Sequence, residues 1–291
     1  MTSPGAATTA PEPRPSGPPG EVARTAIGVD VGGTGVKAGL VDLATGELHS
    51  RRIRRATPKP ATPEAIAAAA LACVDDLVAA SPVASDLPAG CGLPGVVKDG
   101  RLKTATNLDK SWLDAPAQQL LADRLGRPVA IVNDADAAGL GEMTFGAGRG
   151  QGGTVLLLTI GTGIGSALFV NGRLVPNTEL GVFPFHGRNV ETLISGASRE
   201  RRHVGWKRWA RDFSAYIAEL EACFWPDLII LGGGISKEWP RYGARLVSRA
   251  PIVPALLLNS AGIVGAAMVG DAAARAETAS LPHPPAADRV P

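Results

Sequence analysis

The chain has 291 residues, of which 45% are hydrophobic and 19% charged, and its formal net charge is +2. This length allows two medium domains or one large one, and the nearly balanced charge excludes the global positive field typical of nucleic-acid-binding proteins. The sequence contains no run of about 18 apolar residues, the length needed to cross a bilayer, and its N-terminus lacks an apolar signal region. We therefore expect a cytoplasmic protein with neither membrane nor nucleic-acid partners.

The two ends of the chain are rich in proline and alanine and hold almost no large apolar side chains. Such segments cannot bury enough surface to offset the entropy lost on ordering. We therefore predict disordered tails over residues 1–24 and 277–291.

The first ordered segment is a glycine-rich hairpin, with strand patterns over residues 25–31 and 36–43. The loop between them consists of Gly32, Gly33, Thr34 and Gly35. It lacks the Gly-Lys-Ser/Thr of the P-loop, and a strand rather than a helix follows it, so the dinucleotide fingerprint does not apply either. The loop N–H groups, together with Lys37, can still point into one concavity and bind an anion.

Helix and strand patterns alternate through the rest of the first half. Helices are predicted over 63–81, 114–126 and 135–146, and strands over 48–57, 89–102 and 128–134. Thr62 and Asp114 are the expected N-caps of the first two helices, and Gly126 closes the second.

The three cysteines, Cys73, Cys91 and Cys223, are far apart and have no Cys-x-x-Cys spacing. This pattern indicates buried, small apolar side chains in a reducing compartment rather than disulfides or zinc ligands.

The hairpin pattern recurs at residues 154–175, where an apolar strand, a Gly/Thr loop and an alternating strand follow one another. In this internal repeat Asp30 falls opposite Thr159, and Gly32 opposite Gly161. Two such hairpins suggest two similar lobes that face each other across a cleft. A third glycine cluster, at 232–234, follows a buried strand, and its bare backbone suits a flat group such as a nucleoside.

The best candidates for chemistry are Asn133 and Asp134, which end an apolar strand. Asp134 is either a general base toward a hydroxyl or the cap of the next helix, and the pattern leaves both open. Asp136 is expected on the surface of that helix.

Glu179 and Glu191 lie in a helix-poor segment, and each is either an acceptor for sugar hydroxyls or a solvated charge. His186 is either structural or catalytic.

Six motifs in this order resemble the ROK-type sugar kinases of the actin-like ATPase superfamily: DVGGTGVK, GLPG, VNDADA, TIGTGIGSAL, ELG and LGGGIS. The stretches TPKPATPE, NLDKSWL, GWKRWARDF and WPDLIILGGGISK resemble the polyphosphate glucokinase branch, most closely its polyphosphate/ATP-glucomannokinase type. The resemblance implies an α/β, two-lobed actin-like ATPase (ribonuclease H-like) fold with a cleft between duplicated lobes. It places a small lobe at 25–130, completed by a helix at 262–275, and a large lobe at 131–261.

The resemblance also assigns roles to residues. It makes Asp134 the catalytic base and Asp30 a ligand of Mg²⁺, through water. The implied sugar ligands are Asn107, Asn133, Asp134, Glu179 and Glu191. The implied phosphate and nucleotide contacts are Asp30, Gly32, Gly33, Thr34, Gly35, Lys37, Thr162, Gly163, Gly233 and Gly234.

Two departures from the family pattern matter. The cysteine-rich zinc ligands of many members are missing, so we expect no zinc. The usual Glu-x-Gly-His is here Glu179-Leu180-Gly181-Val182. Either His186 supplies the missing imidazole or the contact is absent.

The resulting hypothesis is a kinase that phosphorylates glucose, and mannose as well, with ATP or inorganic polyphosphate and Mg²⁺. Arg201, Arg208 and Arg211, at helical spacing, are either a track for polyphosphate or a solvated face, and residues 51–59 form a second basic cluster. The main alternative is an ATP-only hexose or N-acylhexosamine kinase.

Two other classes are less well supported by the sequence. A sugar-sensing repressor would need a helix-turn-helix before the first strand, and the proline-rich start is not expected to form one. A non-catalytic actin-like protein would not need Asp134 in its sugar motif. The oligomeric state, monomer or homodimer, stays open.

Overall fold

The computed structural model describes residues 24–105 and 107–280. The predicted N-terminal tail lies outside this range except for Arg24, whose guanidinium pairs with Asp271. The C-terminal tail was predicted to begin too early, because the last helix continues to Ser280. The rest of that tail also lies outside the described residues.

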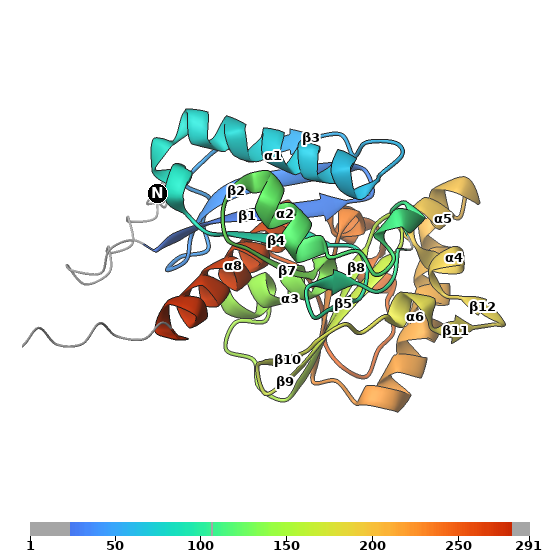
Figure 1. Ribbon diagram of the computed structural model, residues 1–291. Coiled ribbons are helices and arrows are strands. Elements are labelled where there is room, and N and C mark those ends of the chain that lie inside the picture. The colour runs from blue at the N-terminus through green and yellow to red at the C-terminus, as the bar shows by residue number, and fades with distance from the viewer. Residues whose placement is uncertain (1–23, 106, 281–291) are drawn as a thin grey trace, which may run out of the picture.

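Two five-stranded sheets form the framework (Figure 1). The first has the order β3-β2-β1-β4-β7, with strands at Ile53–Arg55, Gly35–Asp42, Thr25–Gly32, Ala89–Leu93 and Val129–Asn133. The second has the order β10-β9-β8-β13-β14, with strands at Arg173–Val175, Ile164–Val170, Thr154–Ile160, Leu228–Gly232 and Ile252–Pro254. Each sheet begins with an antiparallel hairpin and continues in parallel strands, so the predicted duplication is confirmed.

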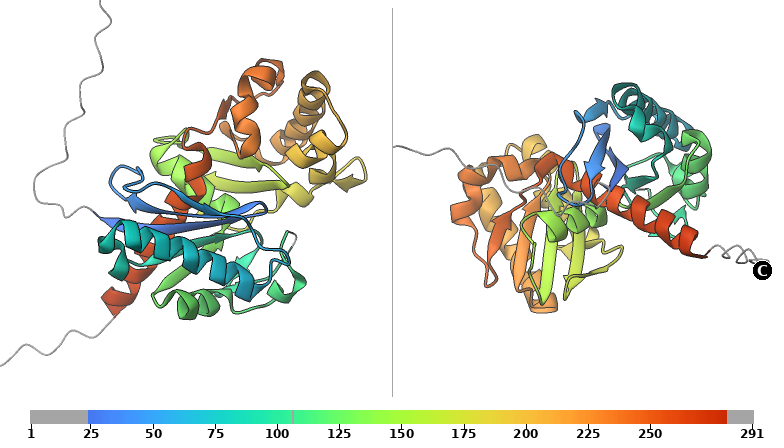
Figure 2. Two further views of the ribbon diagram at one scale, coloured as in Figure 1. Left: turned by 90° about the horizontal axis from the view of Figure 1, so that it is seen from above. Right: turned by 90° about the vertical axis from the view of Figure 1, so that its left-hand side faces the viewer.

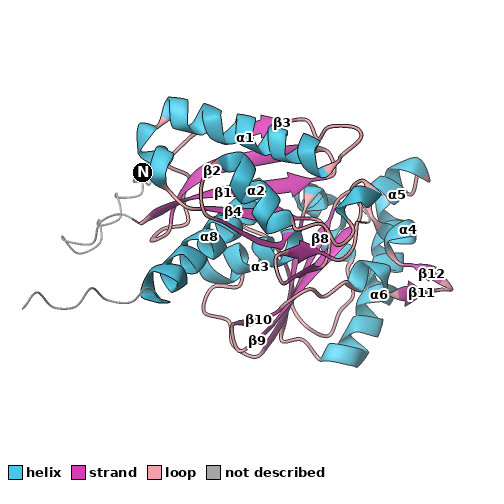
Figure 3. Cartoon of the chain, in the orientation of Figure 1, coloured by secondary structure: helices cyan, strands magenta, loops and turns pink. Residues whose placement is uncertain are grey.

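Helices cover both faces of each sheet (Figure 3). On the outer face of the first sheet lie α1 (Pro63–Ala80) and α2 (Ala117–Leu125), whose apolar sides share one core with β1, β2 and β4. On the outer face of the second sheet lies α6 (Trp206–Phe224), which buries Trp209, Phe213 and Tyr216.

Two helices, α3 (Asp134–Phe145) and α8 (Ala261–Ser280), lie between the sheets. α8 packs on β1 and β4 of the first sheet, α3 packs on β8 and β9 of the second, and the two helices contact each other. A Cβ on Gly265 would come within 1.7 Å of the Ala137 carbonyl oxygen, so only glycine permits this close helix contact. Both views in Figure 2 show α8, in red, along the boundary between the two sheets.

Short elements complete the fold. They are β5 (Val97–Lys98), β6 (Arg101–Leu102), β11 (Pro184–Phe185), β12 (Arg188–Asn189), α4 (Glu191–Ile194), α5 (Gly196–Arg201) and α7 (Trp239–Tyr242). The lobe boundary predicted between residues 130 and 131 falls inside β7, and the assignment of whole lobes stays a prediction.

Three local predictions were wrong. Pro116, not Asp114, precedes the first turn of α2, because the Asp114 carboxylate is taken up by Lys103 and Arg101. Cys223 is exposed on the last turn of α6, unlike the buried Cys73 and Cys91.

The third concerns the predicted arginine face. Arg201 ends α5, whereas Arg208 and Arg211 belong to α6. His203, with φ of 51°, and the cap residue Gly205 break the helix between them. The three arginines therefore do not follow one helical repeat.

Candidate active site

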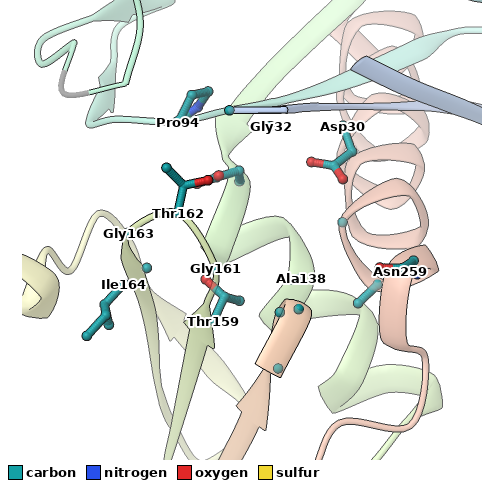
Figure 4. A pocket seen from close by; sticks show the side chains of 18 of the residues that line it. Asp30, Gly32, Pro94, Ala138, Thr159, Gly161, Thr162, Gly163, Ile164 and Asn259 are labelled. Carbon is teal, nitrogen blue, oxygen red and sulfur yellow. The ribbon is translucent and has the colours of Figure 1, made fainter. Parts of the chain in front are cut away.

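A cleft of about 570 Å³ lies between the two sheets and is lined by residues from both. Figure 4 shows part of its lining. Nearly all predicted site residues line it: Asp30, Gly32, Gly33, Thr34, Lys37, Asn107, Asn133, Asp134, Thr162, Gly163, Glu179, Glu191, Gly233 and Gly234. Segments separated by up to about 200 residues of sequence therefore meet in one place, as the sequence predicted.

The two hairpin loops face each other across this cleft. Gly33 is at the tip of the β1–β2 hairpin, and a Cβ there would lie 3.5 Å from Thr162 Oγ1 on the β8–β9 loop. Thr162 reaches toward the β1–β2 hairpin in Figure 4. The two loops therefore lie close enough for one bound anion to contact the backbone of both, although the Gly161 N–H already donates to the Gly163 carbonyl.

Cations gather at the hairpin end of the cleft. Lys37 Nζ lies 2.5 Å from Asp30 Oδ2. Arg54 donates to the Thr34 carbonyl at 2.8 Å, and the half-buried Arg52 donates to the Asn259 carbonyl at 3.4 Å. Lys237 approaches from the third glycine cluster. These four cationic side chains give this end of the cleft a positive charge suited to phosphate groups.

The first turn of α8 adds to this positive end. Gly262 lines the cleft, and a Cβ there would lie 3.0 Å from the Asp30 carboxyl carbon. The positive end of the helix dipole therefore lies beside Asp30, where it favours an anionic ligand or carboxylate.

Four carboxylates line the cleft as successive neighbours. Burial and the neighbouring Asp30 raise the pKa of Asp134 to about 7, and Glu179 contributes to the same rise. Burial and the neighbouring Glu191 raise the pKa of Glu179 above its usual range. Asp30, Asp134, Glu179 and Glu191 are therefore consecutive electrostatic neighbours.

Asp134 is not the cap of α3, because Asn133 has that role. Asn133 Oδ1 accepts from the N–H groups of Ala135 and Asp136, each at 2.9 Å, and its Nδ2 donates to the Gly95 carbonyl at 3.1 Å. One amide hydrogen of Asn133 is left for a ligand. A half-buried carboxylate with a pKa of about 7, at the end of a strand, is the arrangement of a general base.

Hydrogen-bonding side chains line the part of the cleft beside Gly163 of the β8–β9 loop, which we call the sugar end. Gly163 brings Glu191 and Asn107 together, because a Cβ at this position would lie 2.5 Å from Glu191 Oε2 and 3.6 Å from Asn107 Nδ2. Glu191 also accepts from the Ile164 N–H at 3.4 Å. Carboxylate acceptors beside amide groups suit a ligand with several adjacent hydroxyls.

Asp136 was predicted on the surface of its helix, and this prediction was wrong. It is 1% exposed, because α3 is covered on one side by α8 and on the other by the second sheet. Burial raises the pKa of Asp136 to about 6.

Val182, the residue that departs from the family pattern, lines the cleft, whereas His186 does not. His186 packs against Phe185 with the two rings tilted and their centroids 4.2 Å apart. It lines a separate hollow together with Arg202, Arg208 and Arg211. Of the two alternatives for the missing imidazole, the structure favours an absent contact.

Some predicted residues lie outside the cleft lining, and some lining residues were not predicted. Gly35 packs under the Arg54 guanidinium instead of lining the cavity. Arg201, Arg208 and Arg211 are also outside it, and Arg208 and Arg211 pair with Asp212. The second basic cluster supplies Arg52 and Arg54.

Glu142, Asn259 and Gly262 are among the lining residues that the sequence did not predict. No local motif marks these positions, since each reaches the cleft only through the packing of α3 against α8.

Two features are absent from the described residues. No helix among them combines the length and apolarity that crossing a bilayer requires. Nor do residues 24–105 and 107–280 contain a group of three or more histidine, cysteine, aspartate or glutamate side chains arranged to hold a metal ion.

Comparison with known proteins gives a consistent result. Residues 26–202 match the model of the ROK family. Over 246 residues the chain is 44% identical to the polyphosphate glucokinase of Mycobacterium tuberculosis (strain CDC 1551 / Oshkosh), an alignment that covers 84% of this chain and 91% of that protein.

Solved structures agree. The inorganic polyphosphate/ATP-glucomannokinase of Arthrobacter sp. strain KM superposes with a TM-score of 0.83 at 48% identity, over 86% of this chain and 99% of that one. A ROK family glucokinase from Streptomyces griseus, solved in complex with glucose and AMPPNP, gives a TM-score of 0.69 at 28% identity, over 86% of this chain and 100% of that one.

Proposed function

The chain belongs to the ROK family, and on this premise we propose that it is a cytoplasmic glucokinase that uses ATP or inorganic polyphosphate. Its similarity to a polyphosphate glucokinase and to a polyphosphate/ATP-glucomannokinase supports both donors. The observation that carries the proposal is the position of Asp134, with a pKa of about 7, in one cleft with the facing hairpin loops and the Glu179–Glu191 pair.

In this proposal the sugar binds at the end of the cleft lined by Asn107, Glu179 and Glu191. Its 6-hydroxyl faces Asp134, which accepts the hydroxyl proton as the oxygen attacks the terminal phosphorus of the donor. The bond from phosphorus to the bridging oxygen breaks, and the shortened donor leaves with the bonding electrons. A carboxylate with a pKa near 7 can take this proton at neutral pH and release it afterwards.

The donor binds at the cationic end. Backbone N–H groups of the two hairpin loops and the Lys37 ammonium neutralise charge on the phosphoryl group, which is the main catalytic need in phosphoryl transfer. The third glycine cluster, with Gly233 and Gly234, leaves a bare surface for the nucleoside of ATP. Closure of the two lobes would exclude water as a competing acceptor.

Mg²⁺ fits this end of the cleft. Proteins hold Mg²⁺ with one or two carboxylates, while substrate phosphates and water complete its coordination. Asp30 supplies such a carboxylate beside the phosphate loops, and Asp134 is its acidic neighbour. When held near Asp30, Mg²⁺ would reduce the negative charge on the donor phosphates.

For polyphosphate, we propose that Arg52 and Arg54 bind the phosphates next to the transferred group, because both line the cleft. Arg201, Arg208 and Arg211 remain proposed contacts for distant parts of a long polyanion. A long chain meets more cations than ATP does, so its binding should depend more strongly on salt.

We also propose that the enzyme accepts mannose, which differs from glucose only at carbon 2. Val182 lines the cleft and has no hydrogen-bonding group, so it leaves no polar partner unpaired when the 2-hydroxyl changes from equatorial to axial.

The proposed function is tested by incubating the purified protein with glucose and Mg²⁺, with ATP or polyphosphate supplied singly. We expect glucose 6-phosphate with each donor. Product with ATP alone would reduce the proposal to an ATP-dependent kinase, and no product with either donor would contradict it. N-acetylglucosamine and N-acetylmannosamine serve as competing acceptors for the alternative in which the sugar is an N-acylhexosamine.

A further inference from the structure

A chain of part-buried hydrogen bonds joins α3 to two segments of the cleft lining. Oδ2 of the buried Asp136 accepts from the Asn177 N–H at 2.8 Å. The Asn177 side chain in turn makes two hydrogen bonds to the backbone of Val97. Its Oδ1 accepts from the Val97 N–H at 2.8 Å, and its Nδ2 donates to the Val97 carbonyl at 2.9 Å. Val97 packs on the core of the first sheet, whereas Asn177 follows a strand of the second.

We propose that Asp136 and Asn177 are positioning residues for the sugar, an inference that rests on the proposed glucokinase function. Neither side chain lines the cleft. They act through two segments that do, the one that carries Glu179 and the one that begins with Pro94.

The segment with Glu179 is fixed on both sides of that residue. Ser166 Oγ donates to the Thr178 carbonyl at 2.6 Å and accepts from the Leu180 N–H at 3.0 Å. Two residues before Glu179, Asp136 fixes the backbone at Asn177. The Glu179 carboxylate therefore projects from a backbone that is tied both to β9 and to the helix that begins with Asp134.

The segment from Pro94 to Val97 is held at two points by asparagines. Asn133 donates to the Gly95 carbonyl at 3.1 Å, and Asn177 makes its pair of bonds to Val97. Pro94 and Gly95, at the first of these anchors, line the cleft. The general base, a sugar-binding carboxylate and this segment are thus joined by one set of hydrogen bonds.

Asp136 and Asn177 each have a feature that lowers the stability of the folded protein, which supports a role in positioning the two lining segments. Asp136 Oδ1 is buried and has no hydrogen-bond partner among the described residues, and Asn177 has a left-handed φ of 61°. Both features are unfavourable in a folded protein. Apolar packing at these positions would avoid the cost but would not set the direction of the two segments.

Asn177→Gly tests the link most cleanly. Glycine adopts a positive φ without strain and keeps the N–H that Asp136 accepts, so only the two bonds to Val97 are lost. We expect the KM for glucose to rise about tenfold because the two lining segments are no longer held in register, with kcat and the KM for ATP unchanged. Asp136→Ala should raise the glucose KM in the same way, and Asp136→Asn, whose amide oxygen can accept the same N–H, should restore it.

Glu221→Ala is the matched control for Asp136→Ala. Glu221 also accepts backbone N–H groups, from Arg249 and Ala250, but it lies outside the cleft. Its loss should lower the thermal midpoint and leave the glucose KM as in the wild type.

A folded Asn177→Gly protein with a glucose KM within about twofold of the wild type, or with equal rises for glucose and ATP, would overturn the inference. If Asp136→Ala fails to fold, Asn177→Gly decides alone. A wild-type protein that phosphorylates no glucose would overturn the proposed function as well, so the two failures are distinguishable.

Discussion

Asp30 and Lys37 face each other in the β1–β2 ladder, and their side chains form an ion pair of 2.5 Å at the cationic end of the cleft. The hairpin register alone sets this contact, because the two residues are cross-strand partners. Lys37 pairs with the Asp30 carboxylate, and we propose that it also contacts the donor phosphates that bind beside it.

Lys37→Met should therefore weaken the binding of both donors. Methionine keeps much of the length of lysine and removes its charge, which is worth about 1.5 to 3 kcal/mol in a charged hydrogen bond, or about ten- to a hundredfold in affinity. We expect the KM for ATP and for polyphosphate to rise together while the Kd for glucose, measured by calorimetry, stays unchanged. A change confined to glucose binding would place Lys37 in the sugar site instead.

The pH dependence of the reaction should report Asp134. Its pKa of about 7 lies above the usual aspartate range, so the base form grows as the pH rises through 7. We predict that kcat/KM for glucose rises with pH and levels off above about pH 8.

Asp30→Asn removes the negative charge that raises this pKa, so the acidic limb should move to lower pH. The position of the limb, measured at saturating Mg²⁺, is the relevant quantity, since the absolute rate will also fall if Asp30 binds the metal. A limb that stays in place or moves upward would contradict the assigned coupling.

The two arginine clusters can be separated by charge removal. Arg52→Gln with Arg54→Gln should raise the KM for polyphosphate and, to a smaller extent, for ATP, because both residues line the cleft. The triple change of Arg201, Arg208 and Arg211 to glutamine should affect only long polyphosphate, and the effect should shrink at high salt. Equal effects of the triple change on both donors would place these arginines at a shared site.

Val182→His tests the basis of sugar choice. Wild type should use mannose and glucose with specificity constants within about one to two orders of magnitude, or roughly 1.4 to 2.8 kcal/mol. A new imidazole at this position should disfavour mannose relative to glucose. His186→Ala is the control and should leave the ratio unchanged, because His186 lines a different hollow. A wild type that rejects mannose, or a ratio that moves with His186, would refute this explanation.

The sequence predicted most of the features that depend on local pattern. The hairpins, their glycine loops and the internal repeat follow from alternation and turn chemistry, and Thr62 caps α1 as expected. The convergence of Asp30, Asp134, Glu179 and Glu191 followed from the family resemblance, because no local pattern brings such distant residues together.

Features that depend on tertiary packing were missed. Asp136 was placed at the surface because a polar residue on a short helix is usually exposed, but α3 is covered on two sides. The prediction that Arg201, Arg208 and Arg211 share one helix face was wrong, because the sequence pattern did not reveal the break in the helix at 203–205. The role of Gly262 depends on how close α8 comes to Asp30, which no single segment of sequence records.

Asp134→Asn needs evidence of intact folding before its activity is interpreted. A carboxyl whose pKa is raised in the folded state binds its proton more tightly than in the unfolded state. Its stabilising effect is complete below about pH 4 and is lost as the pH rises through about 7. The asparagine variant does not titrate, so at pH 8 its thermal midpoint should exceed that of the wild type by about 2 °C or more, and the difference should shrink toward pH 5.

The most direct test of the account is the turnover of Asp134→Asn on glucose with saturating ATP and Mg²⁺ at pH 8, set beside its glucose affinity measured by calorimetry. If Asp134 is the base between the phosphate loops and the sugar, kcat should fall by about a hundredfold to ten-thousandfold while glucose still binds. A variant that binds glucose and turns over at nearly the wild-type rate would contradict the central assignment.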